Sequence, residues 1–337
     1  MNQRKFFRWQ QTFKIIALAA FVVAFGCTRQ PEATNTDPLP SWNEGKAKQQ
    51  IIQFVKEVTN PDSPKFVPQE ERIATFDNDG TLWAEKPIYF QVIFAFEMLK
   101  EMVQANPSLK EREPIRTIVS GDNEAIAKLS HEDLLGGLIV THVNMTQEVF
   151  TKKAKEWIST AKHPRYNKLY TECVYQPMLE LLDYLRANSF QTWICSGGGI
   201  EYIRLFTEEV YGIPPEQVIG SSVKMEFEDT PKGSIFHRKA EVNSFNDKAV
   251  KPVNIQLHIG KRPILAFGNS DGDIQMMQFA ESKDRPYLSL LLHHDDEKRE
   301  YSYTKGTEKA LELAKEHGWT VVYISKDFKV VFPFEKK

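Results

Sequence analysis

Apolar and polar residues follow two alternating patterns along most of the chain, one typical of helices and one typical of buried strands. From residue 51 to residue 58 the apolar positions recur every three or four residues, which predicts a helix with one buried face. Further helical patterns cover 176–187, 200–210, 247–258 and 307–317. Short apolar runs predict buried strands at 73–76, 191–195, 263–267, 287–292 and 319–324. Strands that alternate with helices in this order predict an α/β fold built on a parallel, doubly wound sheet.

The stretch from residue 84 to residue 170 interrupts this alternation. Its apolar residues recur at helical spacing, as Val92, Phe96 and Leu99 illustrate. We therefore expect a mainly helical insertion over 84–170, placed within a core domain that comprises 45–83 and 171–337.

A different pattern follows the second predicted strand. Two short runs with strand-like alternation, at 223–227 and 235–238, are separated by Pro231 and Gly233. Proline and glycine between such runs are typical of a turn, so we expect a β-hairpin here. A last strand is predicted at 329–332.

The first 27 residues differ from the rest of the chain. Basic residues precede an apolar run at 15–25, which is too short to span a bilayer comfortably as a helix and is arranged as in a secretory signal. The run ends in Ala-Phe-Gly-Cys, which resembles a bacterial lipobox and implies that Cys27 is lipidated and becomes the mature amino terminus. Residues 28–44 are polar and contain proline, as in a flexible linker. We expect an exported lipoprotein that faces the periplasm, with the outer membrane favoured, or a secreted protein; an uncleaved anchor is the alternative.

Composition narrows the choice of partners. The chain has 337 residues, 41% hydrophobic and 26% charged, with a formal net charge of −2. This length is enough for one large domain or a core with an insertion. Because no basic excess is present, we do not expect nucleic-acid binding, and a small molecule is the expected partner. The sequence leaves open the oligomeric state and whether Cys173 and Cys195 pair.

Two carboxylates, Asp77 and Asp79, follow the first predicted strand and precede Gly80 and Thr81. Residues two apart on a strand point to the same side, so the two acids can converge at the carboxyl end of the strand. Ligands of open α/β sheets bind at that edge. Paired carboxylates there suit Mg²⁺, or a nucleophile beside a group that moves protons.

Two other strand ends carry small polar residues. Ser196 is followed by three glycines that open a helix, which offers a hydroxyl and backbone N–H groups to an anion; a tight turn is the plainer interpretation. The run 268–273 offers further oxygen ligands for a metal. Lys248 precedes that strand and can bring positive charge to a phosphate, and Lys251, one helical turn later, is the competing choice.

Taken in order, these residues resemble the four motifs of the haloacid dehalogenase superfamily, over roughly residues 70–295. The surroundings of Ser196 and of 267–276 look most like the phosphoserine and phosphorylcholine phosphatases of that superfamily, and the insertion looks like its helical C1 cap. The resemblance implies a Rossmann-like core and a Mg²⁺-dependent phosphomonoester hydrolase that works through an aspartyl-phosphate. It also implies a small phosphorylated substrate, such as phosphoserine or phosphocholine.

The resemblance implies a role for each motif residue. Asp77 attacks phosphorus, while Asp79 protonates the leaving alcohol and later activates water. The expected Mg²⁺ ligands are Asp77, the backbone carbonyl of Asp79, Asp273 and Asn269. The expected phosphate-binding residues are Thr81, Ser196, Gly197 and Lys248. Many relatives carry aspartate at the position of Asn269, so we expect this site to hold its metal more weakly.

Specificity is expected in the insertion, which can close over the strand ends and read the leaving group. Trp83, Glu85 and Tyr89 are the candidate substrate contacts, because they follow the catalytic strand directly and combine aromatic rings with an acid. The alternative is that these aromatic residues only pack the insertion against the core. Two other functions stay open: a phosphomutase or phosphotransferase of the same fold, and a catalytically weak phosphate-binding lipoprotein.

A second set of metal-binding residue types occurs late in the chain, at 293–296, with the sequence His-His-Asp-Asp. Adjacent residues of an extended chain point apart, so a shared ion would need a turn. Without a third cluster at ligand spacing, the sequence does not favour zinc.

Overall fold

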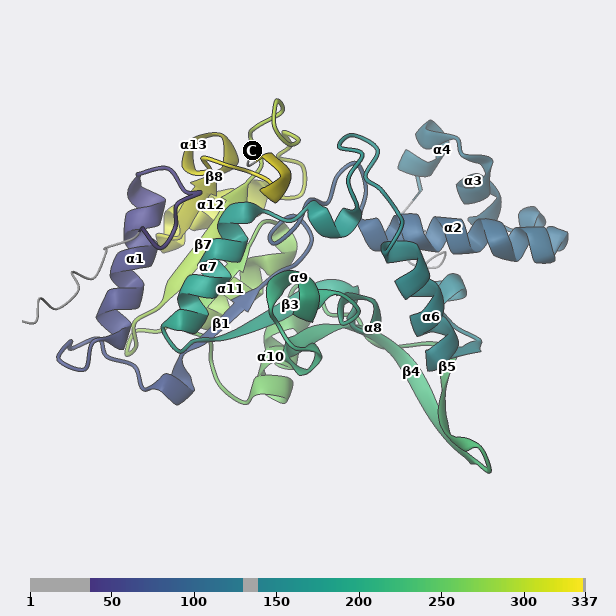
Figure 1. Ribbon diagram of the computed structural model, residues 1–337, viewed down its shortest axis with the longest axis horizontal. Coiled ribbons are helices and arrows are strands. Elements are labelled where there is room, and N and C mark those ends of the chain that lie inside the picture. Colours follow the sequence, from purple (N-terminus) through teal and green to yellow (C-terminus); the bar gives the residue numbers. More distant parts are fainter. Residues whose placement is uncertain (1–36, 130–138, 336–337) are drawn as a thin grey trace, which may run out of the picture. The chain divides into compact units, whose positions relative to one another are not determined.

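The computed structural model describes residues 37–129 and 139–335. The strands of the described residues are β1 (Ile73–Phe76), β2 (Met145–Thr146), β3 (Gln191–Gly199), β4 (Val218–Thr230), β5 (Gly233–Ser244), β6 (Leu265–Gly268), β7 (Leu288–His293) and β8 (Thr320–Tyr323). They form one sheet in the order β2-β5-β4-β3-β1-β6-β7-β8 (Figure 1). Neighbouring strands from β4 to β8 in this order are parallel, whereas β5 is antiparallel to both β4 and β2. The predicted α/β fold with a parallel sheet is confirmed.

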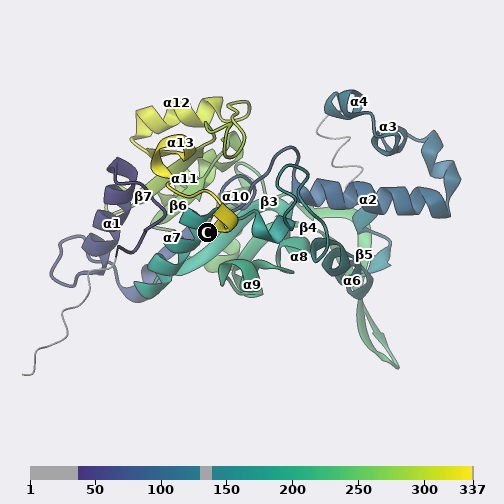
Figure 2. The ribbon, with the colours of Figure 1, turned by 45° about the horizontal axis from the view of Figure 1, so that its top comes forward.

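Helices cover both faces of the parallel strands (Figure 2). One face packs against α1 (Lys46–Thr59) and α7 (Gln176–Ala187), and the other against α10 (Val250–Ile259), α11 (Ile274–Ala280) and α12 (Glu308–His317). The strands divide their side chains between the two cores, as their period of two requires: Leu290 belongs to the first core and Leu291 to the second. Because β1 is buried on both faces, its four residues are all apolar or fully enclosed.

The insertion between β1 and α7 is mainly helical where it is described, as predicted. It contains α2 (Phe90–Ala105), α3 (Ile115–Ser120), α4 (Asn123–Ala127) and α6 (Gln147–Ile158), and Leu99 and Ile115 belong to a small hydrophobic core of its own. Its strand β2 pairs with β5, so the β4–β5 hairpin lies beside α6. The hairpin is longer than the sequence predicts. The role of this insertion as a cap and its limits at 84 and 170 stay predictions.

The chain before α1 differs from the prediction of a flexible linker over 28–44. Leu39 and Trp42 are buried, and the indole N–H of Trp42 donates to the carbonyl of Pro177 at 2.9 Å. The described part of that segment is therefore packed against the core. The predicted signal segment and Cys27 lie outside the described residues. In the part of the chain that is described, no helix has the length and apolar character needed to cross a membrane.

Two further elements differ from the sequence prediction. Residues 329–332 form no strand: the N–H groups of Lys329 and Val330 donate to the carbonyl of Ser41. Val331 and Phe332 are buried, but no strand pairs with them. The predicted helix over 200–210 is two short helices, α8 (Ile200–Ile203) and α9 (Thr207–Tyr211).

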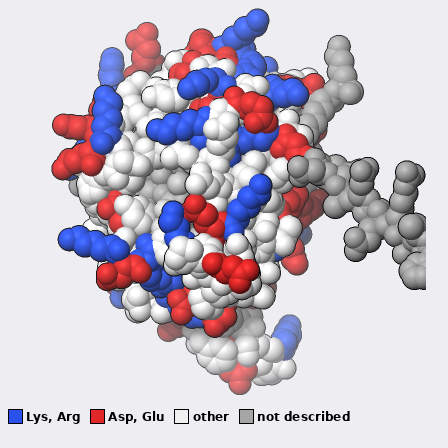
Figure 3. Space-filling view, turned by 90° about the vertical axis from the view of Figure 1, so that its left-hand side faces the viewer, with Lys and Arg blue, Asp and Glu red and all other residues white. Residues whose placement is uncertain are grey.

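Neither the cysteines nor the surface charges of the described residues form a special feature. Cys173 and Cys195 are buried free thiols. Basic and acidic side chains intermingle on the face shown in Figure 3, as the small net charge predicts.

Candidate active site

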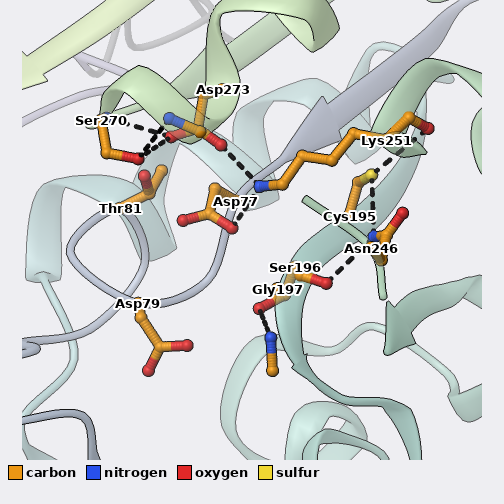
Figure 4. Close-up of polar contacts among 12 residues, drawn as sticks. Asp77, Asp79, Thr81, Cys195, Ser196, Gly197, Asn246, Lys251, Ser270 and Asp273 are labelled. Carbon is orange, nitrogen blue, oxygen red and sulfur yellow. Dashed lines mark hydrogen bonds and ion pairs between the residues drawn. The ribbon is translucent and has the colours of Figure 1, made fainter. Parts of the chain in front are cut away.

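The ammonium of Lys251 joins two strand ends (Figure 4). Its Nζ lies 2.8 Å from Oδ1 of Asp77, which follows β1, and 2.5 Å from Oδ1 of Asp273, which follows β6. The backbone N–H of Asp77 donates to the carbonyl of Phe267, so the β1–β6 pairing holds this acid in place. All three charged side chains are buried. Residues 174 positions apart thus meet at the predicted edge of the sheet.

The loop after β6 folds around the carboxylate of Asp273. Oδ2 of Asp273 accepts hydrogen bonds from the N–H groups of Asn269 and Ser270 and from the Ser270 hydroxyl, at 3.0 to 3.1 Å. A side chain at Gly268 would meet this acid, because a Cβ there would lie 2.5 Å from Cγ of Asp273. Both oxygens of Asp273 are therefore engaged, one by Lys251 and one by the loop, so its first role is to hold the lysine and the loop.

The charged groups of this cluster shift one another's pKa values. Burial and the carboxylate of Asp273 raise the pKa of Asp77 well above its ordinary value, and Lys251 opposes this shift. Burial by itself would lower the pKa of Lys251, but the carboxylates of Asp273 and Asp77 outweigh burial and raise it. Two carboxylates share one ammonium, so the cluster attracts a further cation.

Asp79 lies beside an aromatic cluster. Its Oδ1 accepts a 2.9 Å hydrogen bond from the indole N–H of Trp83, whose ring packs against Phe90 and Phe206 with centroids 4.7 and 4.5 Å away. Burial raises the pKa of Asp79 to about 6, and the nearby charge of Glu85 also raises it. Trp83 is only 1% exposed, which corrects its interpretation as a substrate contact: it orients Asp79.

The turn after Asp79 is packed against the loop that follows β6. The Thr81 hydroxyl donates to Oδ1 of Asn269 at 3.0 Å. The sequence predicts Thr81 as a phosphate-binding residue, whereas in the structure its hydroxyl holds the side chain of Asn269. Gly80 has φ +72°, and a Cβ there would lie 2.1 Å from Nδ2 of Asn269, so glycine is required. That Nδ2 is buried and has no hydrogen-bond partner among the described residues.

Residues 196–199, where the sequence predicts an anion site, form the end of β3, and the pairing of β3 with β4 is irregular there. We call this irregular end the Ser196–Gly199 loop. Asn246 donates to the Ser196 carbonyl at 2.9 Å, and Ser221 donates to the Gly197 carbonyl at 2.7 Å, so both carbonyls are held back from the site. The Ser196 hydroxyl accepts from the N–H of Gly198 at 3.0 Å. A Cβ on Gly197 would meet no atom closer than 3.9 Å, which leaves room beside its backbone. Figure 4 shows this loop facing Asp77 and Lys251.

Lys248 is not the lysine at the carboxylates, which corrects the prediction. It is exposed and has φ +51°, and its backbone N–H donates to the carbonyl of Gly272. It stands in the loop just before α10, whereas Lys251 is on the helix and points inward. Asp271 is also placed differently from a metal ligand, since it accepts from the N–H of Ala310 in the first turn of α12 at 2.8 Å.

The late cluster at 293–296 does not converge on a metal. His294 is buried, and its Nε2 lies 2.8 Å from the Gly80 carbonyl while its Nδ1 lies 3.1 Å from a carboxylate oxygen of Glu300. Asp295 binds Ser325 and Asp296 binds Arg299. No group of three or more His, Cys, Asp or Glu placed to hold a metal occurs among residues 37–129 and 139–335. His294 instead supports the turn next to Asp79, a contact that no sequence pattern announces.

The remaining candidates for substrate contact lie near Asp79. Glu85 is buried, with one carboxylate oxygen 3.3 Å from Nζ of Lys86. Tyr89 is 47% exposed, and the charge of Glu85, its own burial and the charges of Asp79 and Asp77 raise its pKa. Tyr89 is therefore close to the acids and still reachable from solvent.

A family model matches the sequence, and solved structures are similar in fold. A model of the haloacid dehalogenase-like hydrolase family matches residues 74–278. A conserved protein of unknown function from Anaerococcus prevotii DSM 20548 is similar in structure over 82% of this chain and 91% of its own, with 13% identity and a TM-score of 0.50. A phosphoserine phosphohydrolase-like protein from Francisella tularensis is 19% identical over 75% of this chain and 94% of its own, with a TM-score of 0.42.

A probable phosphoserine phosphatase from Vibrio cholerae is 13% identical over 86% of this chain and 71% of its own, with a TM-score of 0.41. No curated protein matches the sequence. At these identities the solved structures describe the fold alone. The family match covers more than half of the chain, from β1 to α11, and includes the ends of β1, β3 and β6. This chain belongs to the haloacid dehalogenase-like hydrolase family.

Proposed function

We propose that this protein hydrolyses small phosphate monoesters, with Asp77 as nucleophile and Asp79 as general acid and base. The observation that carries the proposal is the convergence of Asp77, Lys251 and Asp273 at the end of β1, beside a loop that offers a hydroxyl and an open glycine backbone. A buried ammonium at a nucleophilic carboxylate counters the repulsion between that carboxylate and a phosphate.

The reaction divides into two steps. In the first, a carboxylate oxygen of Asp77 attacks phosphorus, the bond from phosphorus to the ester oxygen breaks, and Asp79 gives its proton to the departing alcohol. In the second, a water molecule attacks the aspartyl-phosphate, Asp79 takes its proton, and inorganic phosphate leaves with Asp77 regenerated. A pKa of about 6 suits Asp79 to both directions of proton transfer near neutral pH.

The oxygen atoms at the site fit a divalent metal such as Mg²⁺. The Asp77 carboxylate, the backbone carbonyl of Asp79 and the side-chain oxygen of Asn269 are hard ligands, and Asp273 supports them. The excess negative charge of the cluster favours a cation as well. Bound there, Mg²⁺ supplies positive charge that offsets the charge of the phosphoryl group.

The contacts of Asn269 explain why we expect the site to bind Mg²⁺ weakly. Its carbonyl oxygen already accepts from Thr81, its amide nitrogen is buried without a partner among the described residues, and it carries no charge. We also propose that the substrate is a small phosphorylated metabolite, with Glu85 and Tyr89 near the leaving group.

An exported, lipid-anchored location through Cys27 is part of the proposal as well. Labelling of the wild type and of Cys27→Ala with a radioactive fatty acid tests this location.

Turnover tests the proposal. The purified protein is given an aryl phosphate, and release of inorganic phosphate is followed with Mg²⁺ and with EDTA, beside Asp77→Asn. We expect release that EDTA suppresses and that Asp77→Asn abolishes. Release that neither change affects, or no release under any condition, would overturn the proposal. Appearance of the phosphoryl group on an added alcohol, with none on water, would favour a phosphotransferase.

A further inference from the structure

The loop that faces Asp77 is held from the insertion as well as from the core. Gln91, in the first turn of α2, accepts a hydrogen bond from the backbone N–H of Gly199 through Oε1, at 2.7 Å. The two residues are 108 positions apart, and Gln91 is buried. The carbonyl side of the loop is fixed by core residues, Asn246 and Ser221. Gln91 is therefore the contact through which the insertion fixes the last amide of the loop.

Two of the three glycines make room for this contact. A Cβ on Gly199 would lie 2.6 Å from Nε2 of Gln91, and a Cβ on Gly198 would lie 3.3 Å from Oε1 of Gln91. A Cβ on Gly197, in contrast, would have the Asn246 carbonyl as its nearest neighbour, at 3.9 Å. The glycines thus have different tasks: Gly197 leaves space at the open side of the loop, whereas Gly198 and Gly199 accommodate the amide of Gln91.

The amide of Gln91 is held in one orientation by His142. Its Nε2 lies 3.1 Å from Nε2 of His142, and because the amide nitrogen can only donate, that imidazole nitrogen must accept. Nδ1 of His142 then carries the proton and faces the Thr141 hydroxyl at 2.8 Å. The imidazole is buried and packs against the rings of Phe94 and Phe150.

The β4–β5 hairpin supports the same arrangement. Arg238 of β5 is buried; its Nε donates to the carbonyl of His142 at 2.6 Å and Nη1 donates to the side chain of Gln147 at 2.5 Å. The guanidinium also lies 4.1 Å from the ring centroid of Phe150. Insertion and hairpin thus form one buried support behind Gln91.

We propose that Gln91 is a positioning residue for the proposed phosphatase reaction, which couples the seating of the insertion on the core to the shape of the Ser196–Gly199 loop. When α2 is in place, the Gly199 amide is paired and the Ser196 hydroxyl and Gly197 backbone are set for a phosphoryl group. When α2 is displaced, the Gly199 amide loses its acceptor and the loop relaxes. The inference rests on the proposed function only for its effect on turnover.

Hydrogen exchange measures the contact without any reaction. In Gln91→Ala, we expect the amides of the segment 197–202 to exchange about tenfold faster than in the wild type, because the Gly199 N–H has no acceptor. Gly199→Ala should do the same, since its Cβ displaces the amide of Gln91. Gln53→Ala is the matched control: this exposed glutamine of α1 bonds Glu57, and its loss should leave the segment unchanged.

Kinetics then separate positioning from a loss of folded protein. With an aryl phosphate as substrate and inorganic phosphate as inhibitor, Gln91→Ala should raise both KM and the inhibition constant about tenfold. A protein that was only partly unfolded would show a lower apparent kcat and an unchanged KM. Since both changes act through one contact, Gly199→Ala should add little further effect in the Gln91→Ala background.

The outcomes are distinct. Unchanged exchange over 197–202 in Gln91→Ala, an unchanged KM, or fully additive effects of Gln91→Ala and Gly199→Ala would each overturn the role of Gln91. If the wild type hydrolyses no phosphate ester, the proposed function is wrong. In that case the exchange rates and the affinity for inorganic phosphate, measured by calorimetry, still decide whether Gln91 positions the loop.

Discussion

The indole N–H of Trp83 donates a hydrogen bond of 2.9 Å to the carboxylate of Asp79. This bond favours the ionised acid, yet burial outweighs it and raises the pKa of Asp79 to about 6. An acid whose pKa is higher in the folded state than in the unfolded state, where it is about 3.9, favours folding most at low pH. Its contribution is complete below about pH 4 and is lost as the pH rises through about 6.

Asp79→Asn removes this titration and keeps an oxygen that accepts from Trp83. In EDTA, we expect the free energy of unfolding of the wild type to fall relative to that of Asp79→Asn between about pH 4 and 6, and to stay lower above that range. Urea denaturation at a series of pH values measures the difference. A difference that does not vary with pH would contradict the raised pKa. Trp83→Phe, which removes the donor, should move the transition to higher pH.

Substitutions of Lys251 and Lys248 test which lysine neutralises the buried carboxylates of Asp77 and Asp273. Lys251→Met leaves the carboxylates of Asp77 and Asp273 buried without their ammonium, so we expect it to lower the free energy of unfolding by about 3 kcal/mol without metal and to abolish turnover. Lys248→Met, at an exposed position, should change stability by less than about 0.5 kcal/mol. Urea denaturation and phosphate release are the measurements. Equal effects of the two changes would refute the assignment of Lys251.

Asn269→Asp tests the reason given for weak metal binding. The added carboxylate should lower the Mg²⁺ concentration for half-maximal activity by about tenfold, since a charged oxygen ligand holds a hard cation more tightly. Without metal it should also lower the melting temperature, because it adds negative charge beside Asp77 and Asp273. Asp271→Asn is the control in the same loop: this residue accepts from the N–H of Ala310 in α12, and its change should leave the Mg²⁺ dependence unchanged. Identical titration curves for Asn269→Asp and the wild type would count against Asn269 as a ligand.

His294 contacts the turn that follows Asp79. It contacts the Gly80 carbonyl and pairs with Glu300, whose side chain is buried. His294→Phe keeps a ring of similar size but leaves the Gly80 carbonyl without its partner, while Glu300 keeps Tyr175 and the N–H of Tyr301 as donors. We expect a loss of about 2 kcal/mol in unfolding free energy and a lower kcat. His293→Phe, at the neighbouring half-buried position, should have little effect on kcat. A normal kcat in His294→Phe would show that Gly80 needs no such support.

The strand ends could be predicted because their signals are local. An apolar run followed by paired acids or by Ser-Gly places residues at the edge of a parallel sheet, whatever the rest of the chain does. Asp77 and Ser196 are predicted in this way, whereas Asp273 is singled out within the run 268–273 by the resemblance to the family motifs. The structure brings Asp77 and Asp273 to one ammonium. Choosing Lys251 over Lys248 required knowing that α10 begins at Val250 and that the backbone at Lys248 is left-handed, which no periodicity reveals.

The supporting residues could not be predicted, because their roles depend on tertiary contacts alone. Gln91 is a single polar residue at the start of an apolar helix, and nothing in its neighbourhood announces a partner at Gly199. The pairing of His294 with Gly80 likewise joins positions 214 apart. The sequence cannot show that Trp83 packs in the core, because an aromatic residue beside an acid looks the same in sequence whether it faces a substrate or is buried. The buried segment around Trp42 is predicted as part of a linker for another reason, because the residues of 28–44 are mostly polar and include prolines.

The most direct test of the account is to look for the phosphoryl group on Asp77. Asp79→Asn should still accept phosphate from an aryl ester, whose leaving group needs little protonation, but should release it slowly because no base activates water. After acid quenching and proteolysis, mass spectrometry should find one phosphoryl group on the peptide that contains Asp77. If the wild type turns over while this peptide stays unmodified in the variant, or if the group is found on another residue, Asp77 is not the nucleophile.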